Sequence, residues 1–331
     1  MNGRSADQTG TEAVALGFRA RRQGRQAQRR ASAQELGAII PKRGVPWLYA
    51  APTLLFVVAI FAYPIVTLVK YSLENVGTSQ YLPTTYVGTA NFSYIFKDSL
   101  FIRAIENNLK LFLCVPVMVI LAVILATILY DRPRGWKVYR VLLFLPYILS
   151  IPVVGIVFSY LFTYNGSINE ILRGTGLGFL AKDWLGTPAW ALPTIGFVII
   201  WKELGFGIIL MNARLLSVSE EYFEAARVDG AGWWRRLWHI ALPQLVPAIA
   251  FFSIVELINM LSWVFAYIYV ISLGGPENST VVTEFYIYRQ VFENNAIGVG
   301  AAAGVVLLGV VSVLIAARMF MHRRLTAYGY D

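Results

Sequence analysis

Charged residues are scarce in this sequence of 331 residues: Asp, Glu, Lys and Arg together make up 14%, against about 25% in soluble globular proteins. Hydrophobic residues make up 57%, and they gather in long apolar runs, so lipid is the solvent for most of the chain. The one cysteine, Cys114, excludes an intrachain disulfide. The two histidines, His239 and His322, lie far apart and have no cysteine or paired carboxylates at ligand spacing. We therefore predict no metal site and no catalytic residues.

The net charge of +9 is high enough to suggest nucleic acid, but the distribution of the charge is typical of a membrane protein. Basic residues gather in the tails and in short loops between apolar runs, where they set membrane topology. No recognition helix or basic-aromatic strand surface accompanies them, so no nucleic-acid partner is expected. The sequence also lacks a phosphate-binding glycine loop of the Walker type, so we expect no ATPase site in this chain.

Six apolar runs predict an all-α membrane protein with six transmembrane helices. Each run is near the length of about 20 residues that a helix needs to cross about 30 Å of hydrocarbon. The predicted spans are Trp47–Tyr71, Leu109–Tyr130, Val141–Tyr164, Ala191–Leu210, Pro247–Ile271 and Ile297–Phe320. They form one transmembrane domain, residues 47–320, between a basic tail, residues 1–46, and a short tail, residues 321–331.

The positive charges predict the orientation of the spans. If the amino terminus is cytoplasmic, the segments on the inner side are the first tail, residues 131–140, residues 211–246 and the end of the chain from Arg318. These segments hold 20 of the 28 lysines and arginines. The asymmetry predicts that both termini are cytoplasmic.

The basic tail has two other interpretations, a cleaved signal peptide and a twin-arginine export signal. The apolar run that follows the tail is of full membrane length and lacks a small-residue cleavage site, which argues against both. We expect a flexible cytoplasmic tail instead.

The loop between the fourth and fifth spans has a helical pattern. Ser219 can cap a short helix that carries two glutamates in its first turn, where they match the helix dipole. Asp229 and Gly230 form a turn signal. A second helical stretch follows from about Gly232 to Ala241, and Pro243 is expected to close it. The pattern predicts a helix–turn–helix hairpin on the cytoplasmic side.

This hairpin resembles the EAA loop of binding-protein-dependent ABC-transporter permeases. The resemblance covers the spacing of the whole motif as well as its residue types, in the loop and on the side where the family has it. The matching residues are Glu224, Ala225, Ala226, Asp229, Gly230, Ala231, Ile240, Leu242 and Pro243.

Other stretches resemble the carbohydrate permeases of the maltose-transporter type, and in particular the longer-named of the two partner permeases. The matching stretches are Gly88, Asn91-Phe92, Leu145-Pro146, Gly166–Asn169, Ile268–Pro276, Thr280 and Tyr286–Tyr288. Two departures stand out: Ser219 occupies a position where the family usually has proline, and the large periplasmic insertion of the maltose permease is missing. The resemblance covers about residues 47–320.

The resemblance implies a type I importer fold in a bacterial inner membrane. It implies a second homologous permease, two ATPase subunits that bind ATP and magnesium, and an extracellular solute-binding protein that delivers a sugar. This chain itself would bind no cofactor. Glu224 would face basic ATPase residues, Ala225 and Ala226 would allow close helix approach, and Gly230 would make the turn of a rigid lever, residues 219–243. The alternative is an amphipathic loop that places Arg227, Arg235 and Arg236 at lipid phosphates.

Polar residues inside the fourth and fifth spans predict a passage for the sugar. A charge at the centre of a span costs about 2.5–3.5 kcal/mol on insertion scales, so such residues should face protein or a water-filled cavity. Helical spacing places several of them on one face of the fifth span. The candidate passage residues are Lys202, Glu203, Phe206, Ser253, Glu256, Asn259, Met260 and Trp263. The alternative is a structural pairing of Lys202 with Glu203 or Glu256.

Two other classes of membrane protein fit the sequence less well. An ion channel would have a span with arginine at every third position or a re-entrant filter loop. A membrane enzyme would have a cluster of His, Asp or Glu at the membrane face. Within the transporters, an importer of amino acids or peptides is the nearest alternative to a sugar importer.

Overall fold

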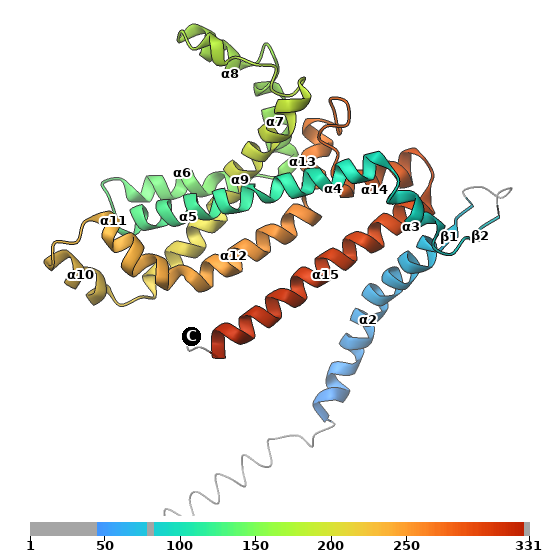
Figure 1. Cartoon of the computed structure of the whole chain (residues 1–331). Helices are drawn as coiled ribbons and strands as arrows, with labels where there is room; N and C mark the ends of the chain where they lie inside the picture. Colours follow the sequence, from blue (N-terminus) through green and yellow to red (C-terminus); the bar gives the residue numbers. More distant parts are fainter. Residues whose placement is uncertain (1–44, 78–82, 328–331) are drawn as a thin grey trace, which may run out of the picture. The chain divides into compact units, whose positions relative to one another are not determined.

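Helices dominate the computed structural model of this protein, which describes residues 45–77 and 83–327 (Figure 1). Contacts divide the chain, within the helix that begins at Val45, into two units, residues 1–66 and 67–331, and each is considered by itself. The described part of the first unit belongs to α2 (Val45–Ser72), which begins two residues before the predicted first span. The basic tail up to residue 44 lies outside the described residues, as do residues 328–331.

The second unit begins with the end of α2 and continues with one short antiparallel pair of strands. β1 (Glu74–Asn75) pairs with β2 (Thr85–Tyr86). The helices then follow to the end of the described chain. In order, they are α3 (Ala90–Ile95), α4 (Ser99–Phe112), α5 (Cys114–Tyr130), α6 (Trp136–Ile148), α7 (Ile151–Leu161), α8 (Ser167–Gly174), η1 (Gly178–Leu180), α9 (Pro188–Leu216), α10 (Glu220–Val228), α11 (Trp233–Arg236), η2 (Leu237–Ala241), α12 (Leu242–Ser262), α13 (Val264–Ile271), α14 (Thr283–Tyr288), η3 (Arg289–Glu293) and α15 (Ile297–Ala327).

The helices confirm a membrane protein built from apolar spans. Within the described residues, five helical stretches are long and apolar enough to cross a membrane, and a bent pair of helices brings the number up to six. The stretches are Tyr49–Ser72, Ser99–Tyr130, Pro188–Leu216, Trp233–Ser262 and Ile297–Ala317, with α6 and α7 as the bent pair.

The prediction of one continuous third span was wrong. α6 and α7 meet at an angle of 99°, and Leu149 and Ser150 between them are extended. Pro152 follows in the first turn of α7. Proline has no backbone N–H and its ring displaces the carbonyl four residues earlier, so Pro152 favours the start of a new helix over a continuation of α6.

The fifth span was also predicted as one helix, and it breaks at Trp263 (φ −125°) into α12 and α13. A residue from another span supports the break. Asn108 on α4 donates a hydrogen bond from Nδ2 to the Met260 carbonyl at 2.9 Å, and its Oδ1 accepts bonds from the Thr283 backbone N–H and hydroxyl. Asn108 thus satisfies a carbonyl that the helix end leaves without a partner.

The core of the second unit forms where α9 packs against α5, α6 and α12. Gly207 on α9 permits this packing. A Cβ there would lie 2.7 Å from the Phe252 ring of α12 and 3.0 Å from Ala122 of α5. α9 is therefore held closely between α5 and α12, and it carries two of the charged residues discussed below.

Candidate functional site

The predicted hairpin is present, and its turn is built by backbone geometry. α10 begins after Ser219, although the serine side chain makes no capping hydrogen bond. At the other end, Gly230 has φ +73°, the left-handed conformation that glycine adopts without strain. The Gly230 N–H donates to the Arg227 carbonyl at 3.1 Å and the Ala231 N–H to the Ala226 carbonyl at 2.8 Å, which is a Schellman motif.

The second arm differs from the prediction that Pro243 closes it. α11 continues through the π-helical turn η2 into α12, so one helical stretch runs from Trp233 to Ser262. Pro243 lies in the first turn of α12, directly after the wider π turn, where its ring can be accommodated. The hairpin is therefore continuous with the fifth span.

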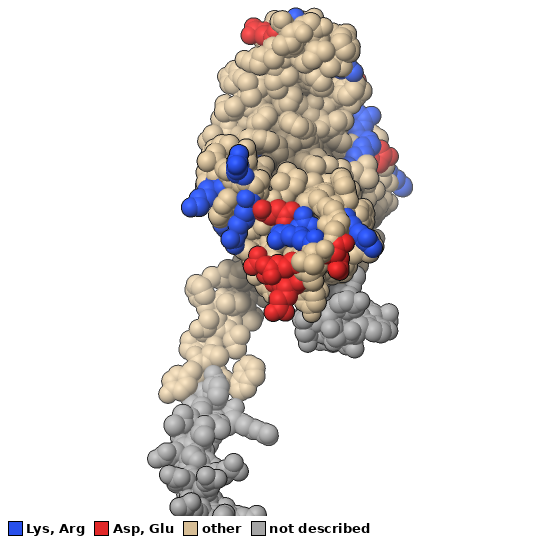
Figure 2. All heavy atoms as spheres, turned by 90° about the vertical axis from the view of Figure 1, so that its left-hand side faces the viewer, with Lys and Arg blue, Asp and Glu red and all other residues tan. Residues whose placement is uncertain are grey.

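The motif residues of the hairpin are largely accessible. Glu224, Ala225, Asp229, Gly230 and Pro243 are exposed. Ala226, Ile240 and Leu242 are half-buried, since they face the rest of the hairpin and the spans. Figure 2 shows acidic and basic side chains side by side over this end of the second unit, and the exposed acids on α10 are Glu220, Glu221 and Glu224.

A cavity of about 500 Å³ lies between the spans. Its walls come from α6 and the start of α7, from the middle of α9, and from both sides of the break between α12 and α13. The lining residues are Tyr147, Ile151, Ile199, Lys202, Glu203, Phe206, Val255, Glu256, Asn259, Met260, Trp263, Val264 and Tyr267. Seven of the eight predicted passage residues are therefore brought together, and Ser253 is not among the lining residues.

Lys202 and Glu203 already have partners in this cavity. The Lys202 Nζ lies 3.1 Å from Glu203 Oε1, and the Tyr267 hydroxyl donates a hydrogen bond of 2.8 Å to the same oxygen. Lys202 is 6% exposed, and its Nζ also lies 5.4 Å from the centre of the Tyr147 ring. The structural pairing of Lys202 with Glu203 is thus present, whereas the described residues show no ion pair between Lys202 and Glu256.

Glu256 differs from its neighbours. Its side chain is completely buried, and neither carboxylate oxygen makes a well-formed hydrogen bond within the described chain. Asn259, one turn further along α12, is half-buried and lines the same cavity. Buried polar groups are almost always bonded, so this carboxyl group is unusual among the lining residues that the structure describes.

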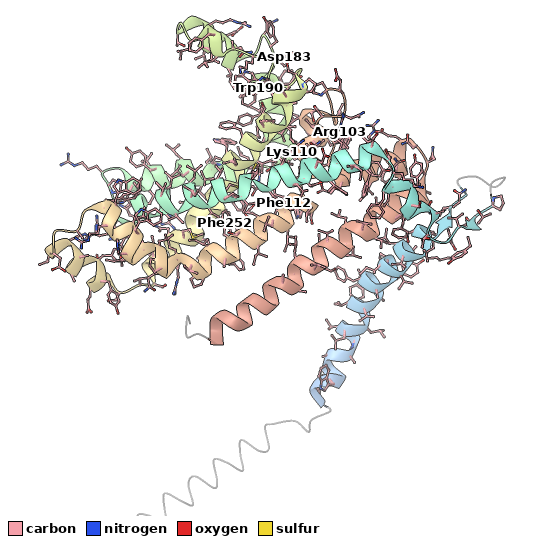
Figure 3. All side chains as sticks on the ribbon, viewed as in Figure 1. Arg103, Lys110, Phe112, Asp183, Trp190 and Phe252 are labelled. Atoms are coloured by element: carbon pink, nitrogen blue, oxygen red, sulfur yellow. The ribbon has the colours of Figure 1, made fainter. Side chains whose placement is uncertain are left out.

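Aromatic rings close the cavity toward the hairpin. The Tyr147 and Phe206 rings stack with centres 5.5 Å apart, and the Phe252 ring lies 5.9 Å from that of Phe206. Phe252 is labelled on α12 in Figure 3. Ser253 follows Phe252, on the hairpin side of the lining residues of α12, which explains why it lies outside the cavity. Tyr147 was missed in the sequence, where its position after Pro146 was the one available signal.

A second cavity of about 870 Å³ lies between α4 and the first turns of α9. Arg103 and Lys110 of α4 (Figure 3) line it together with Glu106 and Glu277. Its cations are engaged locally, since Arg103 donates to the Glu277 carbonyl and Lys110 contacts the Asn107 side chain. The smaller cavity is the better candidate, because among the described lining residues it is the one with a buried carboxyl group that makes no well-formed hydrogen bond.

Comparisons with known proteins identify the family of this chain. The family described as binding-protein-dependent transport system inner membrane component matches residues 110–325. The lactose transport system permease protein LacF of Rhizobium radiobacter is 31% identical over 74% of this chain and 83% of its own length. The diacetylchitobiose uptake system permease protein NgcF of Streptomyces coelicolor is 34% identical over 74% of this chain and 72% of its own.

The fold is similar to that of a solved transporter. A chain from the crystal structure of a bacterial ABC transporter involved in the import of the acidic polysaccharide alginate superposes with a TM-score of 0.72 and 28% identity. The match covers 85% of this chain and 96% of that chain. A second structure with the same TM-score shows the alginate transporter in complex with a pentasaccharide-bound periplasmic protein. This chain therefore belongs to the family of binding-protein-dependent transport system inner membrane components, and it is a multi-pass permease of an ABC importer in a bacterial inner membrane.

Proposed function

We propose that this permease carries a neutral sugar of one or a few residues through the cavity that contains Glu256. The sugar would be delivered by an extracellular solute-binding protein, and a second homologous permease would complete the pathway. Two partner ATPase subunits would supply the energy, with ATP and magnesium bound to them and no cofactor bound to this chain.

The buried carboxyl group of Glu256 is the observation that carries the proposal. Sugar hydroxyls donate hydrogen bonds, and a buried acceptor that has no well-formed hydrogen bond of its own would provide the counterpart for them. Rings beside it, such as Trp263 and Phe206, offer faces for the apolar side of a sugar ring. Relatives named for lactose and diacetylchitobiose support a sugar as the cargo.

The charges of the cavity favour a neutral cargo over an acidic one. Lys202 is the one cation among the described residues that line it, and Glu203 lies at ion-pair distance from Lys202. A carboxylate or phosphate on the cargo would meet Glu256 with no free cation in the lining to balance it, which is unfavourable away from water. The importer of acidic alginate is therefore a model for the fold and not for the cargo.

The hairpin would couple the permease to ATP hydrolysis. Its exposed acids, including Glu224, would contact basic residues of an ATPase subunit, and Ala225 and Ala226 would allow a close approach. Because α11 continues into α12, a movement of the hairpin would be transmitted to the helix that carries Glu256 and Asn259. This mechanism requires both termini and the hairpin to be cytoplasmic.

Reconstitution tests the proposal. The permease pair, the ATPase subunits and the solute-binding protein are placed in proteoliposomes, and ATP-dependent uptake of labelled neutral disaccharides, acidic oligosaccharides, amino acids and dipeptides is compared. We expect uptake of a neutral sugar. Uptake of an amino acid or a peptide in its place would refute the proposed cargo class.

The orientation has a separate test in intact cells. Cys114 is replaced by serine and a cysteine is introduced by Gly232→Cys, in the exposed turn of the hairpin. A membrane-impermeant thiol reagent added outside should leave this cysteine unmodified until the membrane is permeabilised. Modification from outside intact cells would place the hairpin on the wrong side of the membrane for coupling.

A further inference from the structure

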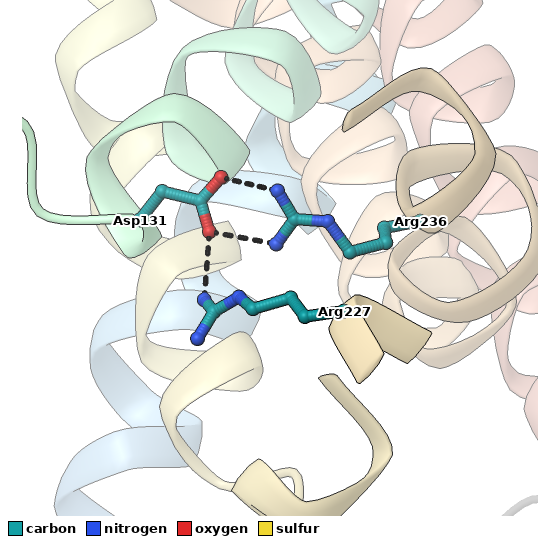
Figure 4. Close-up of polar contacts among 3 residues, drawn as sticks. All are labelled: Asp131, Arg227 and Arg236. Carbon is teal, nitrogen blue, oxygen red and sulfur yellow. Dashed lines mark hydrogen bonds and ion pairs between the residues drawn. The ribbon is translucent and has the colours of Figure 1, made fainter. Parts of the chain in front are cut away.

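Asp131 joins the hairpin to the rest of the second unit (Figure 4). It is the residue that follows α5, and its carboxylate forms ion pairs with one arginine from each arm of the hairpin. Arg236 of α11 contacts it with two nitrogens, Nη1 to Oδ1 at 3.1 Å and Nη2 to Oδ2 at 3.0 Å. Arg227 of α10 adds a third contact, Nη2 to Oδ1 at 3.2 Å.

These contacts should stabilise the protein more than an ordinary surface ion pair does. Isolated surface pairs contribute little to stability, but bidentate pairs between arginine and a carboxylate, and networks of several charges, are the exceptions. The Arg236 side chain is 13% exposed and that of Asp131 26%, so water screens the pair only in part. Arg227 is more exposed, at 46%, and is the weaker of the two contacts.

Apolar packing completes the same joint. Phe223 lies one turn before Arg227 on α10, is 1% exposed, and packs on the Tyr130 ring with centres 4.7 Å apart. The inner face of α10 therefore attaches to the end of α5 through one aromatic and one charged contact. We use the name hairpin joint for Tyr130, Asp131, Phe223, Arg227 and Arg236.

An acid at this position of α5 needs an explanation. The carboxyl end of a helix carries partial negative charge, so an aspartate there is unfavourable unless cations balance it. The two cations come from the hairpin, 96 and 105 residues further along the chain. Local helix formation would be better served by almost any other residue, which indicates that Asp131 serves the contact with the hairpin.

The joint leads toward the cavity through packed helices. α5 packs along α9, and the Asn212 side chain of α9 donates a hydrogen bond of 3.3 Å to the Ala126 carbonyl of α5. α9 in turn carries Lys202, Glu203 and Phe206 into the cavity wall. A rigid connection of this kind can carry a displacement from the hairpin to the cavity.

We propose that Asp131 is a positioning residue for coupling: by holding Arg236 and Arg227 it fastens the hairpin to α5, so that α5 and α9 move with the hairpin. This inference rests on the proposed coupling function. The helix that runs from α11 into α12 is one connection from the hairpin to the cavity, and the contact between the hairpin and α5 adds a second. The hairpin then moves two helices of the cavity wall, α9 as well as α12. Without the joint, the hairpin would still bind the ATPase subunit but would move against α5.

The test measures sugar uptake and ATP hydrolysis together in proteoliposomes that contain the whole importer. For Asp131→Ala we expect ATPase subunits to remain bound and hydrolysis to continue, while sugar transported per ATP falls roughly three- to tenfold, the range of coupling between contacting residues. Glu293→Gln is the matched control. It removes an exposed ion pair of similar length, Arg289–Glu293 at 3.3 Å, and should leave the ratio unchanged.

A charge exchange separates positioning from simple loss of structure. It is made in an Arg227→Gln background, which retains the bidentate pair. Asp131→Arg and Arg236→Asp should each lower the ratio of transport to hydrolysis, and the two together should restore it to at least half of the background value. Asp131→Ala with an unchanged ratio, or an exchange that restores nothing, would overturn the role of Asp131.

The same data distinguish this inference from the proposed function. If the unaltered importer shows no ATP-driven uptake, or if Glu224→Lys leaves ATPase binding and coupling intact, the coupling function of the hairpin fails and Asp131 loses its role with it. If the unaltered importer is coupled, Glu224→Lys uncouples it and Asp131→Ala does not, the inference alone fails.

Discussion

The hairpin and the cavity are built in opposite ways. The hairpin lies within 25 consecutive residues, its turn depends on the local bonds around Gly230, and Asp131 forms ion pairs with the arginines of its inner face. The cavity is assembled from three separate parts of the chain: α6 with α7, α9, and α12 with α13. At its centre Glu256 is buried and has no well-formed hydrogen bond.

This difference indicates two different tasks. The inward arginines of the hairpin are ion-paired with Asp131, so the hairpin is suited to transmit movement as a rigid body. A region with a buried carboxyl group that makes no well-formed hydrogen bond is less stable than it would be with an apolar residue there. Such a group is retained where a visiting molecule supplies the missing bonds.

The largest effect is expected from a change that breaks the turn of the hairpin. Gly230→Pro cannot adopt φ +73° and removes the N–H that bonds to Arg227, so the turn is lost at a local cost of about 3 kcal/mol. We expect the protein to insert in the membrane, with sugar uptake reduced more than about tenfold. Uptake in proteoliposomes and membrane insertion by protease protection measure the two outcomes.

Gly232→Ala is the matched control for the turn. Gly232 has φ −63° and no atom near the position of an added Cβ, so alanine fits without strain and uptake should match that of the unaltered protein. Glu224→Lys tests the exposed face without altering the turn and should uncouple ATP hydrolysis from uptake. Normal transport by both Gly230→Pro and Glu224→Lys would contradict the role of the hairpin.

In the cavity, the next largest effect is expected from Glu256→Leu. Leucine has a similar volume and no buried charge, so the variant should unfold at a higher temperature than the unaltered protein, whereas its sugar uptake should fall about tenfold. Thermal unfolding in detergent and uptake in proteoliposomes give the two readouts. An importer that contains Glu256→Leu and transports normally would show that the carboxyl group takes no part in the passage.

The sequence predicts the hairpin, which is local in the chain, better than it predicts the cavity, which is built from distant segments. The hairpin and its motif residues were predicted because Glu224, Gly230 and Pro243 lie within one short segment whose spacing carries information. The continuation through Pro243 was missed, because a π turn that accommodates proline leaves no simple pattern in the residues. Six apolar spans were predicted from length alone, and the bend before Pro152 shows that length does not reveal where a span changes direction.

The cavity was predicted in its residue types but not in its shape. Lys202, Glu203 and Glu256 are conspicuous in apolar spans, so the cost of a charge in lipid was enough to single them out. The break at Trp263 follows from bonds between Asn108, Met260 and Thr283, residues separated by more than 150 positions for the first bond. Periodicity along one helix contains no information about such contacts.

The bonds of Asn108 at the break between α12 and α13 give a third prediction, with a smaller expected effect. Asn108→Ala leaves the Met260 carbonyl and the Thr283 N–H and hydroxyl without their partner, which should lower the free energy of unfolding by about 2–3 kcal/mol. The rim of the cavity at Met260 should loosen, so the affinity for sugar should fall while coupling of hydrolysis to transport is retained. Thermal unfolding and the sugar concentration at half-maximal uptake measure these effects; an unchanged unfolding temperature would exclude Asn108 as a support.

The smallest expected effect distinguishes a residue of α12 that lines the cavity from a residue of α12 that does not. Asn259 lines the cavity and Ser253 does not, although both were predicted to lie in the passage. Asn259→Ala should reduce uptake roughly three- to tenfold, because a neutral hydrogen bond to the cargo is lost. Ser253→Ala should change uptake less than about twofold, as for a residue without contacts to the cargo. Equal losses in the two variants would mean that the passage continues beyond the rings of Phe206 and Phe252, on the side where Ser253 lies.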